Sequence, residues 1–257
     1  MSTLAGRVAI VTGASRGVGR GIALRLAADG AAVAVNYRRD GAAAGEVVKE
    51  ITAGGGVAVG YRAAIDDEAA TTAMVHAVRR DLGPVSIVVS NAGTASRGLD
   101  VVGTSREEYL SLLSVHALGP IGLLREALPD LRAAGRGDVV MISSNTVASA
   151  PAQAAPYTMA KAAMEIVVRT LAREERQHGI RANIVAPGLV ATDMGSRLVR
   201  ASAGATLGDL AESSPFGRVC TPEDVAGAVA WLVSADAGYV TGQKILVDGG
   251  GRDAAIF

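Results

Sequence analysis

Tyr157 and Lys161 are the residues whose types and spacing first suggest chemistry. They interrupt the small, apolar stretch APYTMAKAAM (155–164), and a spacing of four residues places both side chains on one face of a helix. A phenol ionises near pH 10, and a neighbouring ammonium favours the ionised form, so such a pair would exchange a proton more readily than a phenol alone. The alternative is structural, with the hydroxyl bound to water and the lysine extended to reach solvent.

A second set of residues would bind the phosphates of a nucleotide. Gly13, Gly17 and Gly19 follow the first Val/Ile-rich run and open a segment with helical periodicity, in the spacing G-x3-G-x-G rather than G-x-G-x-x-G. Glycines at such a turn let backbone N–H groups and a helix N-terminus approach a pyrophosphate. Their placement directly after a strand predicts a dinucleotide site.

The end of the second apolar run predicts which dinucleotide binds there. Asn36, Tyr37, Arg38 and Arg39 occupy the place where an acidic residue would accept hydrogen bonds from both ribose hydroxyls, and Arg16 lies in the glycine loop. Guanidinium groups suit phosphate geometry, so the sequence predicts NADP(H) rather than NAD(H). The alternative is that Arg38 and Arg39 form only a solvated strand end.

Short apolar runs that alternate with helix-period segments would position these residues. The runs are rich in Val and Ile and bounded by Gly or Pro, as buried strands are. They cover residues 7–11, 31–37, 56–61, 85–90, 137–143, 180–187 and 244–248. The helix-period segments cover residues 21–30, 46–55, 73–83, 105–134, 156–178 and 222–234. This alternation predicts an α/β fold: a doubly wound parallel sheet of about seven strands, Rossmann-type, with helices on both faces.

The chain is expected to form a single domain over residues 1–257, because no linker, repeat or low-complexity tract divides it. The stretch 193–216 is the exception to the alternation. It is long and rich in Gly, Ala and Ser, and it predicts a loop that acts as a substrate lid over the site.

Composition excludes several classes of protein. Hydrophobic residues make up 49% and charged residues 19%, and the formal net charge is zero, which is typical of a well-buried globular protein without a nucleic-acid partner. One cysteine, Cys220, and three widely separated histidines predict no disulfide and no metal site. The N-terminus lacks the pattern of a secretory signal, and no apolar run reaches the roughly 20 residues of a membrane span. A cytoplasmic protein with no membrane partner is expected, and Trp231 is expected in its core.

Taken in order, the motifs resemble those of the classical short-chain dehydrogenase/reductase family over essentially the whole chain. They are Thr12-Gly13-x3-Gly17-x-Gly19, Asn91-Ala92-Gly93, Ser144 thirteen residues before Tyr157, Tyr157-x3-Lys161, Pro187-Gly188 followed by Thr192, Val240-Thr241-Gly242 and Asp248-Gly249-Gly250. Within the family, Asn36-Tyr37 and the ending VTGQKILVDGGG are closest to the 3-oxoacyl-acyl-carrier-protein reductase group.

The resemblance implies catalytic roles for four positions. Tyr157 would be the general acid/base that exchanges a proton with the substrate oxygen, and Lys161 would lower the pKa of the phenol and hold the nicotinamide ribose. Ser144 would hydrogen-bond the carbonyl oxygen, whereas the adjacent Ser143 is expected to be structural. His116 replaces an Asn that usually kinks a helix and holds a water, so it would relay protons itself, anchor the water differently, or be a core histidine.

The resemblance also implies the contacts of the cofactor. Pro187 and Gly188 would turn the chain beside the nicotinamide, and the backbone of Val190 with the hydroxyl of Thr192 would bind its carboxamide. A helix N-cap is the alternative role for Thr192. The full set expected to contact the cofactor is Gly13, Ser15, Arg16, Gly17, Val18, Gly19, Asn36, Tyr37, Arg38, Ala64, Ile65, Asn91, Ala92, Gly93, Tyr157, Lys161, Pro187, Gly188, Val190 and Thr192.

One cofactor contact departs from the family pattern. Ala64 occupies the place of an Asp that commonly binds the adenine amino group. Ile65 would still supply a backbone contact, and Asp66 would substitute for the missing carboxylate only through a shifted turn. Weaker adenine recognition follows.

The activity implied is NADP(H)-dependent reduction of a ketone, a 3-oxoacyl thioester or a related carbonyl, to a secondary alcohol. Arg132, Arg136, Arg173 and Arg176 are candidates for meeting an acidic carrier protein, but His178 replaces an Arg that such enzymes often show. The alternatives are an NAD-dependent alcohol or sugar dehydrogenase and a cofactor-binding protein without turnover. Because family members usually assemble about twofold axes, a homotetramer or homodimer is expected.

Overall fold

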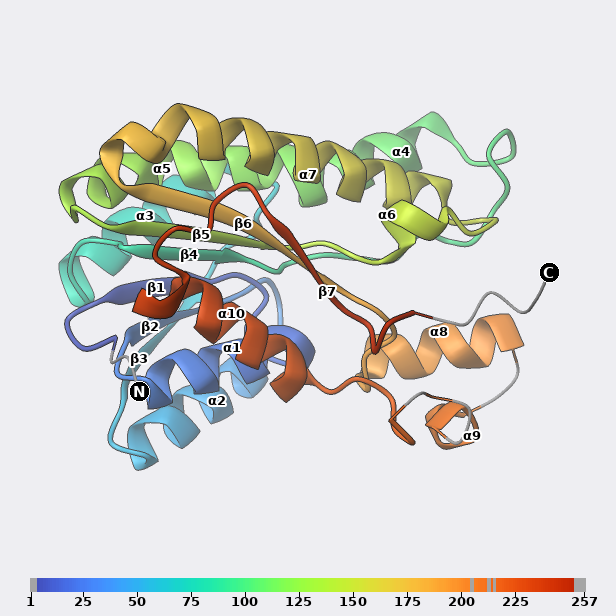
Figure 1. Cartoon of the computed structure of the whole chain (residues 1–257), viewed down its shortest axis with the longest axis horizontal. Helices are drawn as coiled ribbons and strands as arrows, with labels where there is room; N and C mark the ends of the chain where they lie inside the picture. Colours follow the sequence, from blue (N-terminus) through green and yellow to red (C-terminus); the bar gives the residue numbers. More distant parts are fainter. Residues whose placement is uncertain (1–3, 204–205, 212–213, 215, 252–257) are drawn as a thin grey trace.

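A parallel sheet of seven strands forms the centre of the computed structural model, which describes residues 4–203, 206–211, 214 and 216–251 (Figure 1). The strand order is β3-β2-β1-β4-β5-β6-β7, and each neighbouring pair is parallel. The strands are β1 (Val8–Val11), β2 (Ala32–Tyr37), β3 (Val57–Arg62), β4 (Ile87–Ser90), β5 (Gly137–Ile142), β6 (Ile180–Pro187) and β7 (Lys244–Val247). Each overlaps one of the seven predicted runs, with β3 ending one residue beyond its run, so the predicted fold class is confirmed.

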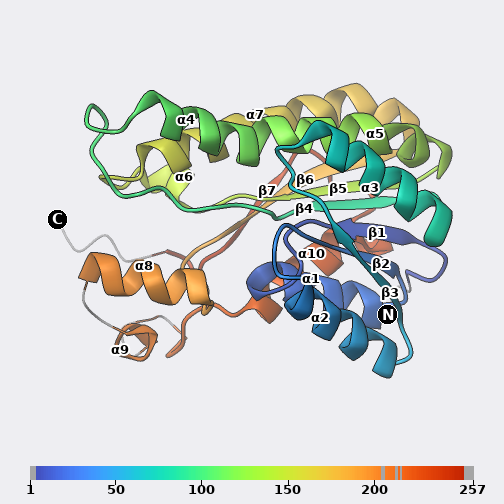
Figure 2. The ribbon, with the colours of Figure 1, turned by 180° about the vertical axis from the view of Figure 1, so that it is seen from behind.

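Helices cover both faces of this sheet. They are α1 (Gly17–Ala28), α2 (Gly41–Ala53), α3 (Glu68–Asp81), α4 (Arg106–Leu113), α5 (Gly119–Ala133), α6 (Thr146–Ser149), α7 (Ala155–Glu175), α8 (Asp193–Ala203), α9 (Leu207–Ala211) and α10 (Pro222–Val233). Shorter helical segments are the π-helix η1 (Ser114–Leu118) and the 3₁₀ turns η2 (Arg176–His178) and η3 (Ala235–Ala237). One face carries α1, α2 and α10, and the other carries α3, α5 and α7 (Figures 1 and 2).

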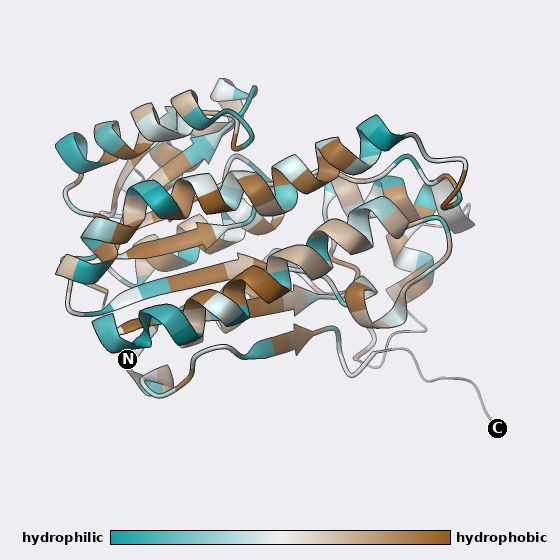
Figure 3. Ribbon diagram, turned by 90° about the horizontal axis from the view of Figure 1, so that it is seen from above, coloured by the Kyte–Doolittle hydropathy of each residue, from teal (hydrophilic) through white to brown (hydrophobic). Residues whose placement is uncertain are grey.

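The central strands are buried on both sides, which explains why their sequences are continuous apolar runs rather than alternating ones. Every residue of β1, β4, β5 and β6 is buried, and apolar side chains of the flanking helices complete one hydrophobic cluster on each face (Figure 3). The edge strand β7 is only half-buried, and Leu246 is 53% exposed. None of the helices in the described part of the chain is long and apolar enough to cross a membrane.

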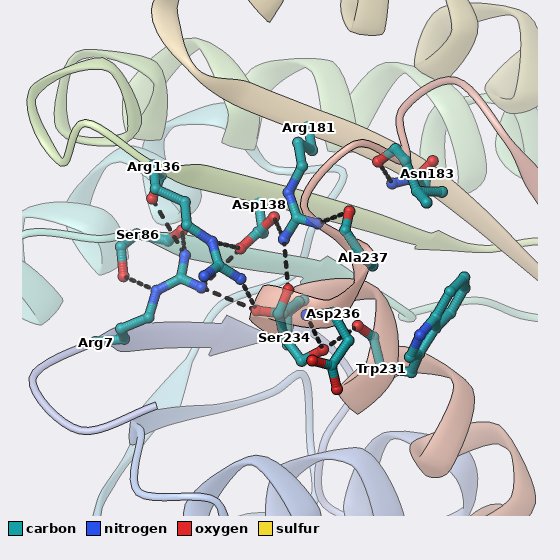
Figure 4. Close-up of polar contacts among 12 residues, drawn as sticks. Arg7, Ser86, Arg136, Asp138, Arg181, Asn183, Trp231, Ser234, Asp236 and Ala237 are labelled. Carbon is teal, nitrogen blue, oxygen red and sulfur yellow. Dashed lines mark hydrogen bonds and ion pairs between the residues drawn. The ribbon is translucent and has the colours of Figure 1, made fainter. Parts of the chain in front are cut away.

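At the amino ends of the strands, three guanidinium groups converge on the buried carboxylate of Asp138 (Figure 4). Arg7 and Arg181 each approach its oxygens to 2.6 Å, and Arg136 approaches to 3.6 Å. The same guanidinium groups donate to carbonyl oxygens at and just beyond the end of α10, those of Val233, Ser234 and Ala237. Cations suit the unpaired carbonyl groups of a helix C-terminus, so this cluster fastens α10 to β5 and β6.

Three expectations about local structure were wrong. Segment 105–134 is not one helix, because η1 separates α4 from α5. The predicted lid is not a loop, since its described residues form α8 and α9; residues 204–205, 212–213 and 215 of the lid lie outside the described residues. Trp231 is 42% exposed on α10 rather than in the core, which the smaller apolar residues of that helix fill.

Candidate active site

The predicted site residues come from the loops that follow β1 to β6, together with helix α7 and segment η1. In a parallel sheet these loops meet at the carboxyl edge of the strands, where ligands of open α/β sheets bind. Helices α6 and α8 lie at this same end of the sheet in both views (Figures 1 and 2). The fold therefore brings together residues that are as much as 175 positions apart, Gly17 and Thr192 among them.

Ser144, two residues beyond β5, hydrogen-bonds the side chain of Tyr157. Its hydroxyl oxygen also accepts from the Thr146 backbone N–H at 3.2 Å and from the Thr146 hydroxyl at 2.9 Å. With both acceptor positions occupied, the Ser144 proton is directed to the phenol. Sequence reasoning missed Thr146, whose only signal was a hydroxyl two residues beyond the predicted serine.

The environment of Tyr157 keeps its phenol protonated. Burial raises the pKa of Tyr157, and the hydrogen bond with Ser144 lowers it by less. The sequence suggested the opposite direction, with Lys161 favouring the phenolate. In the structure the ammonium lies 5.7 Å from the centre of the Tyr157 ring, and it donates a hydrogen bond to the carbonyl oxygen of Ile142 at 2.6 Å instead. A protonated phenol is the form that can donate a proton.

Lys161 is itself buried, with 4% of its surface exposed. Burial lowers the pKa of Lys161 to about 8, and the negative charge of Glu165, one helical turn further along α7, opposes this effect. The ammonium charge of the pair is therefore lost near pH 8 rather than near pH 10.5. Ser143 is also buried and donates its hydroxyl proton to Glu165 at 2.6 Å, as its predicted structural role requires.

His116 is buried against Tyr157. The two rings meet edge to face with their centres 5.2 Å apart. Nε2 lies 2.9 Å from the Thr94 carbonyl oxygen and 3.3 Å from its N–H, and the shorter contact assigns the proton to Nε2. Burial and the charge of Lys161 lower the pKa of His116 to about 3, so the ring is neutral. Its Nδ1 is buried and has no hydrogen-bond partner among the described residues.

The π-helix η1 places this imidazole. A π-turn is rare and commonly marks a functional site, because it turns one side chain away from the helical pattern. Gly93 makes room for the ring, since a Cβ there would lie 2.5 Å from Cε1 of His116. His116 is thus brought to Tyr157 by both η1 and the loop after β4.

The glycine loop follows β1 as predicted. Gly13 and Gly17 have φ values of +62° and +55°, the left-handed region that favours glycine. At Gly19 a Cβ would lie 2.3 Å from the Gly13 carbonyl oxygen and 2.5 Å from Nδ2 of Asn91, so no side chain fits. Arg16 is the N-cap of α1 and makes no side-chain cap, which leaves the first N–H groups of the helix for another acceptor.

Two buried side chains hold this loop in place. The Thr12 hydroxyl accepts from the N–H groups of Asn91 and Ala92, both at 2.9 Å. Asn36 is 2% exposed, accepts from the Gly13 N–H at 3.2 Å and donates to the Ala63 carbonyl at 3.0 Å. The Asn36 side chain is therefore occupied within the sheet, and its contribution to a bound cofactor would be to shape the glycine loop.

The remaining phosphate-side residues lie at the surface of the same edge. Arg16 and Arg38 are exposed and have no side-chain partner among the described residues, and Ser15, Val18 and Tyr37 are half-buried. The uncapped helix start, the glycine loop and these cationic side chains fit a phosphorylated dinucleotide.

The nicotinamide-side residues also lie here. Pro187 ends β6 and is buried, and the Gly188 N–H donates to the Val247 carbonyl of β7. Val190 forms an isolated bridge with Cys220. The Thr192 hydroxyl accepts from the Gly195 N–H at 3.1 Å, which is the helix-capping alternative, and its methyl group faces Gly17. Whether Thr192 also binds a carboxamide stays a prediction.

The structure also describes the residues predicted to lie near the adenine, where the sequence departs from the family pattern. Ala64 is half-buried and Ile65 is buried, with its carbonyl oxygen against Gly119 at the start of α5. Asp66 is exposed and makes no side-chain contact among the described residues. Whether Asp66 contacts the adenine stays a prediction.

Two of the four arginines considered for a carrier protein are engaged elsewhere. Arg132 forms two hydrogen bonds with Glu175, at 2.7 and 2.8 Å, and Arg136 belongs to the Asp138 cluster. Arg173 and Arg176 are exposed on α7 and η2. Within the described residues no group of three His, Cys, Asp or Glu side chains could hold a metal ion.

Comparisons with known proteins extend over nearly the whole chain. The family model described as Enoyl-(Acyl carrier protein) reductase matches residues 13–251. The chain is 40% identical to a short-chain type dehydrogenase/reductase of Picea abies, over 96% of this chain and 93% of that protein. It is 38% identical to versicolorin reductase 1 of Aspergillus parasiticus, over 96% of this chain and 97% of that protein. The solved structure of L-sorbose reductase from Gluconobacter frateurii, complexed with NADPH and L-sorbose, is similar with a TM-score of 0.89 at 26% identity, covering 99% of both chains.

Proposed function

Because this chain belongs to the classical short-chain dehydrogenase/reductase family, whose members are oxidoreductases acting on alcohol and carbonyl groups, we propose that it is an NADP(H)-dependent enzyme that reduces a ketone to a secondary alcohol. The observation that carries this proposal is the hydrogen-bonded pair of Ser144 and Tyr157 beside the buried Lys161, at the same sheet edge as the glycine loop. A protonated phenol in that place is suited to deliver a proton to a carbonyl oxygen.

In the proposed mechanism the cofactor, when bound, supplies the hydride, and the chain supplies orientation and the proton. Ser144 and Tyr157 hydrogen-bond the substrate oxygen, and Tyr157 gives up its proton as negative charge develops there. Lys161 holds the nicotinamide ribose, and its ammonium charge stabilises the phenolate that remains. The Nδ1 lone pair of neutral His116 accepts a hydrogen bond from a water that returns a proton to Tyr157.

The residues proposed to bind the cofactor are those predicted from the sequence. Gly13, Gly17 and the open N-terminus of α1 would bind the pyrophosphate. Arg16 and Arg38 would form charge-assisted hydrogen bonds with a 2′-phosphate. Two observations support NADPH over NADH: the exposed, unpaired state of these guanidinium groups, and the NADPH found in the structurally similar L-sorbose reductase.

The proposed substrate is a small ketone with an apolar portion, and a 3-oxoacyl thioester is one candidate within that class. Met194 and Leu198 on α8 are 44% and 57% exposed at the edge where the site lies, so the described part of the lid offers apolar surface. The carrier-bound form of a thioester has weaker support, because Arg132 and Arg136 are held by Glu175 and Asp138.

We also infer that copies of the chain associate along the exposed edge. Leu246 of the edge strand β7 is 53% exposed and Trp231 of the neighbouring α10 is 42% exposed. Unpaired sheet edges with apolar side chains favour pairing with a second chain. Light scattering of the purified protein would test this, and a monomer at micromolar concentration would contradict it.

The proposed function is tested by the Tyr157→Phe variant. NADPH oxidation would be followed with a panel of ketones and 3-oxoacyl thioesters, and the Kd of NADPH and NADH would be measured by fluorescence. Loss of the acid should lower kcat by about 10²–10⁴-fold with the Kd of NADPH little changed. Ketone reduction by the variant at the wild-type rate would refute the role of Tyr157, and tighter binding of NADH than of NADPH would refute the cofactor assignment.

A further inference from the structure

Glu165 is a buried carboxylate next to the catalytic residues, and the proposed mechanism does not use it. It lies one helical turn beyond Lys161 on α7 and is 3% exposed. Three groups from three elements bind it: the Ser143 hydroxyl at 2.6 Å, the Lys244 ammonium of β7 at 2.7 Å and the Arg169 guanidinium of α7 at 3.4 Å. A carboxylate is almost never buried so fully without such partners.

The choice of cations around Glu165 is unusual for this chain. Of its 25 basic residues only Lys49, Lys161 and Lys244 are lysines. Lys49 is exposed and forms a surface pair with Glu46. The other two are near the buried Glu165: Lys161 one helical turn before it on α7, and Lys244 at 2.7 Å. A lysine is a compact charge whose pKa responds to burial and neighbours, whereas an arginine stays charged. Two of the three lysines therefore lie near one carboxylate.

Glu165 is the nearby group that favours the charged form of Lys161. The neighbours of the ammonium are the neutral ring of His116 from η1, the protonated Tyr157 from α7 and the Ile142 carbonyl from β5. Burial lowers the pKa of Lys161 to about 8, and Glu165 alone among the acidic side chains counteracts it. Without that carboxylate, the ammonium would lose its proton at still lower pH.

We propose that Glu165 is a positioning residue that keeps Lys161 charged at neutral pH, and that Lys244 sets how much of this negative charge Lys161 experiences. The carboxylate thereby couples the catalytic helix α7 to the end of β5 through Ser143 and to the edge strand β7 through Lys244. This inference rests on the proposed function, in which the charge of Lys161 stabilises the developing phenolate of Tyr157.

A purely structural role makes a different prediction. If Glu165 only fastened β7 to α7, replacing either partner would lower stability in the same direction and leave the titration of Lys161 unchanged. The electrostatic role predicts that the two substitutions move the pKa of Lys161 in opposite directions. Removing the carboxylate lowers the pKa of Lys161, whereas removing the competing Lys244 cation raises it.

The experiment compares Glu165→Gln, Lys244→Met and their double variant with the wild-type protein. Gln retains the volume of the side chain and an oxygen that accepts the Ser143 proton. Glu46→Gln is the matched control, because it removes a carboxylate from a surface lysine pair. The first readout is the pH profile of kcat/KM for ketone reduction. The second readout requires neither activity nor cofactor: it is the NMR titration of lysines labelled with ¹³C at Cε, of which the chain has three. The Lys244 signal is identified by its loss in Lys244→Met, and the Lys49 signal by its change in Glu46→Gln.

We expect Glu165→Gln to shift the alkaline limb of the profile, and the NMR titration of Lys161, by about one pH unit or more to lower pH. Lys244→Met should shift the titration of Lys161 to higher pH, the double variant should recover part of the shift, and Glu46→Gln should match wild type. Unchanged titration of Lys161 in Glu165→Gln would overturn the inference, as would an unchanged or lower titration pH in Lys244→Met. If Glu165→Gln does not fold, the sign of the Lys244→Met shift decides the question. A wild-type protein that reduces no ketone would refute the proposed function, while the NMR titration would still test Glu165.

Discussion

Replacing Asp138 by Asn should destabilise the fold strongly while leaving the active site intact. The carboxylate is 2% exposed and is shared by Arg7 and Arg181, each at 2.6 Å, with Arg136 at 3.6 Å (Figure 4). Asn is nearly isosteric with Asp, so the change removes one negative charge and little volume. The guanidinium groups then keep only carbonyl acceptors and repel one another, as the lowering of the pKa of Arg7 by burial and by the other two arginines already indicates.

The magnitude follows from the burial of the groups. Breaking a buried ion pair by removing one partner costs about 3–5 kcal/mol. The lower end applies here, because the Arg7 and Arg181 side chains are 15% and 9% exposed and retain carbonyl partners such as Ser86 and Ala237. A loss of about 3 kcal/mol in the free energy of unfolding corresponds to a fall in Tm of roughly 6–12 °C for a chain of this size.

Thermal unfolding by circular dichroism, with urea titration at 20 °C, would measure this loss. Asp236→Asn is the matched control, because Asp236 lies beside the cluster but is exposed and forms no ion pair with it (Figure 4). This control substitution should change the free energy of unfolding by no more than about 0.5 kcal/mol. Arg136→Met should cost no more than about 1 kcal/mol, because it removes a hydrogen bond to Val233 but also relieves repulsion.

A loss below about 1 kcal/mol in Asp138→Asn would refute the argument that the carboxylate balances the arginines. Unchanged stability with lost ketone reduction would refute the separation of this cluster from the active site at the opposite edge of the sheet. The kcat of the variant, measured at 20 °C where the protein stays folded, should be close to that of the wild type.

Three further changes test the site itself. Gly19→Ala places a methyl group 2.3 Å from the Gly13 carbonyl oxygen, so we expect about 1–3 kcal/mol of lost stability and at least tenfold weaker NADPH binding, measured by fluorescence titration; unchanged affinity would contradict the fit of the loop. His116→Asn should keep or raise turnover, and a folded but inactive variant would give the imidazole a role of its own. Thr146→Val removes a 2.9 Å hydrogen bond to Ser144 and should lower kcat about 5–30-fold with rescue by Thr146→Ser, whereas equal loss in both would point to packing.

The strands and the pairing of Tyr157 with Lys161 on one helix face were predictable because their signals are local. Runs of Val and Ile bounded by Gly or Pro identify buried parallel strands, and every such run overlaps an observed strand. Tyr157 and Lys161 needed only helical spacing to be placed on one face of α7. The glycine loop needed only its place after β1.

The features that were missed depend on contacts between distant segments. Residues 105–134 keep apolar spacing throughout, and only packing against Gly93 and Tyr157 accounts for the side of the helix on which His116 lies. The lid contains Gly and Ser, which indicate a loop, although the Thr192 cap and the apolar residues of α8 support a helix. In the sequence alone, Glu165 is an ordinary helical residue. Only the structure shows that Lys244, 79 positions later, forms an ion pair with it.

The π-helix η1 makes the number of residues between α4 and α5 important. A π-turn contains about one residue more than an α-turn, and one residue corresponds to about 100° of rotation. The surplus is absorbed locally, so α4 and α5 both keep their apolar sides on the protein while His116 turns to Tyr157. Deleting one residue from 114–118 would restore an unbroken α-helix and swing the imidazole away from the phenol. This stretch is therefore sensitive to a change in the number of residues.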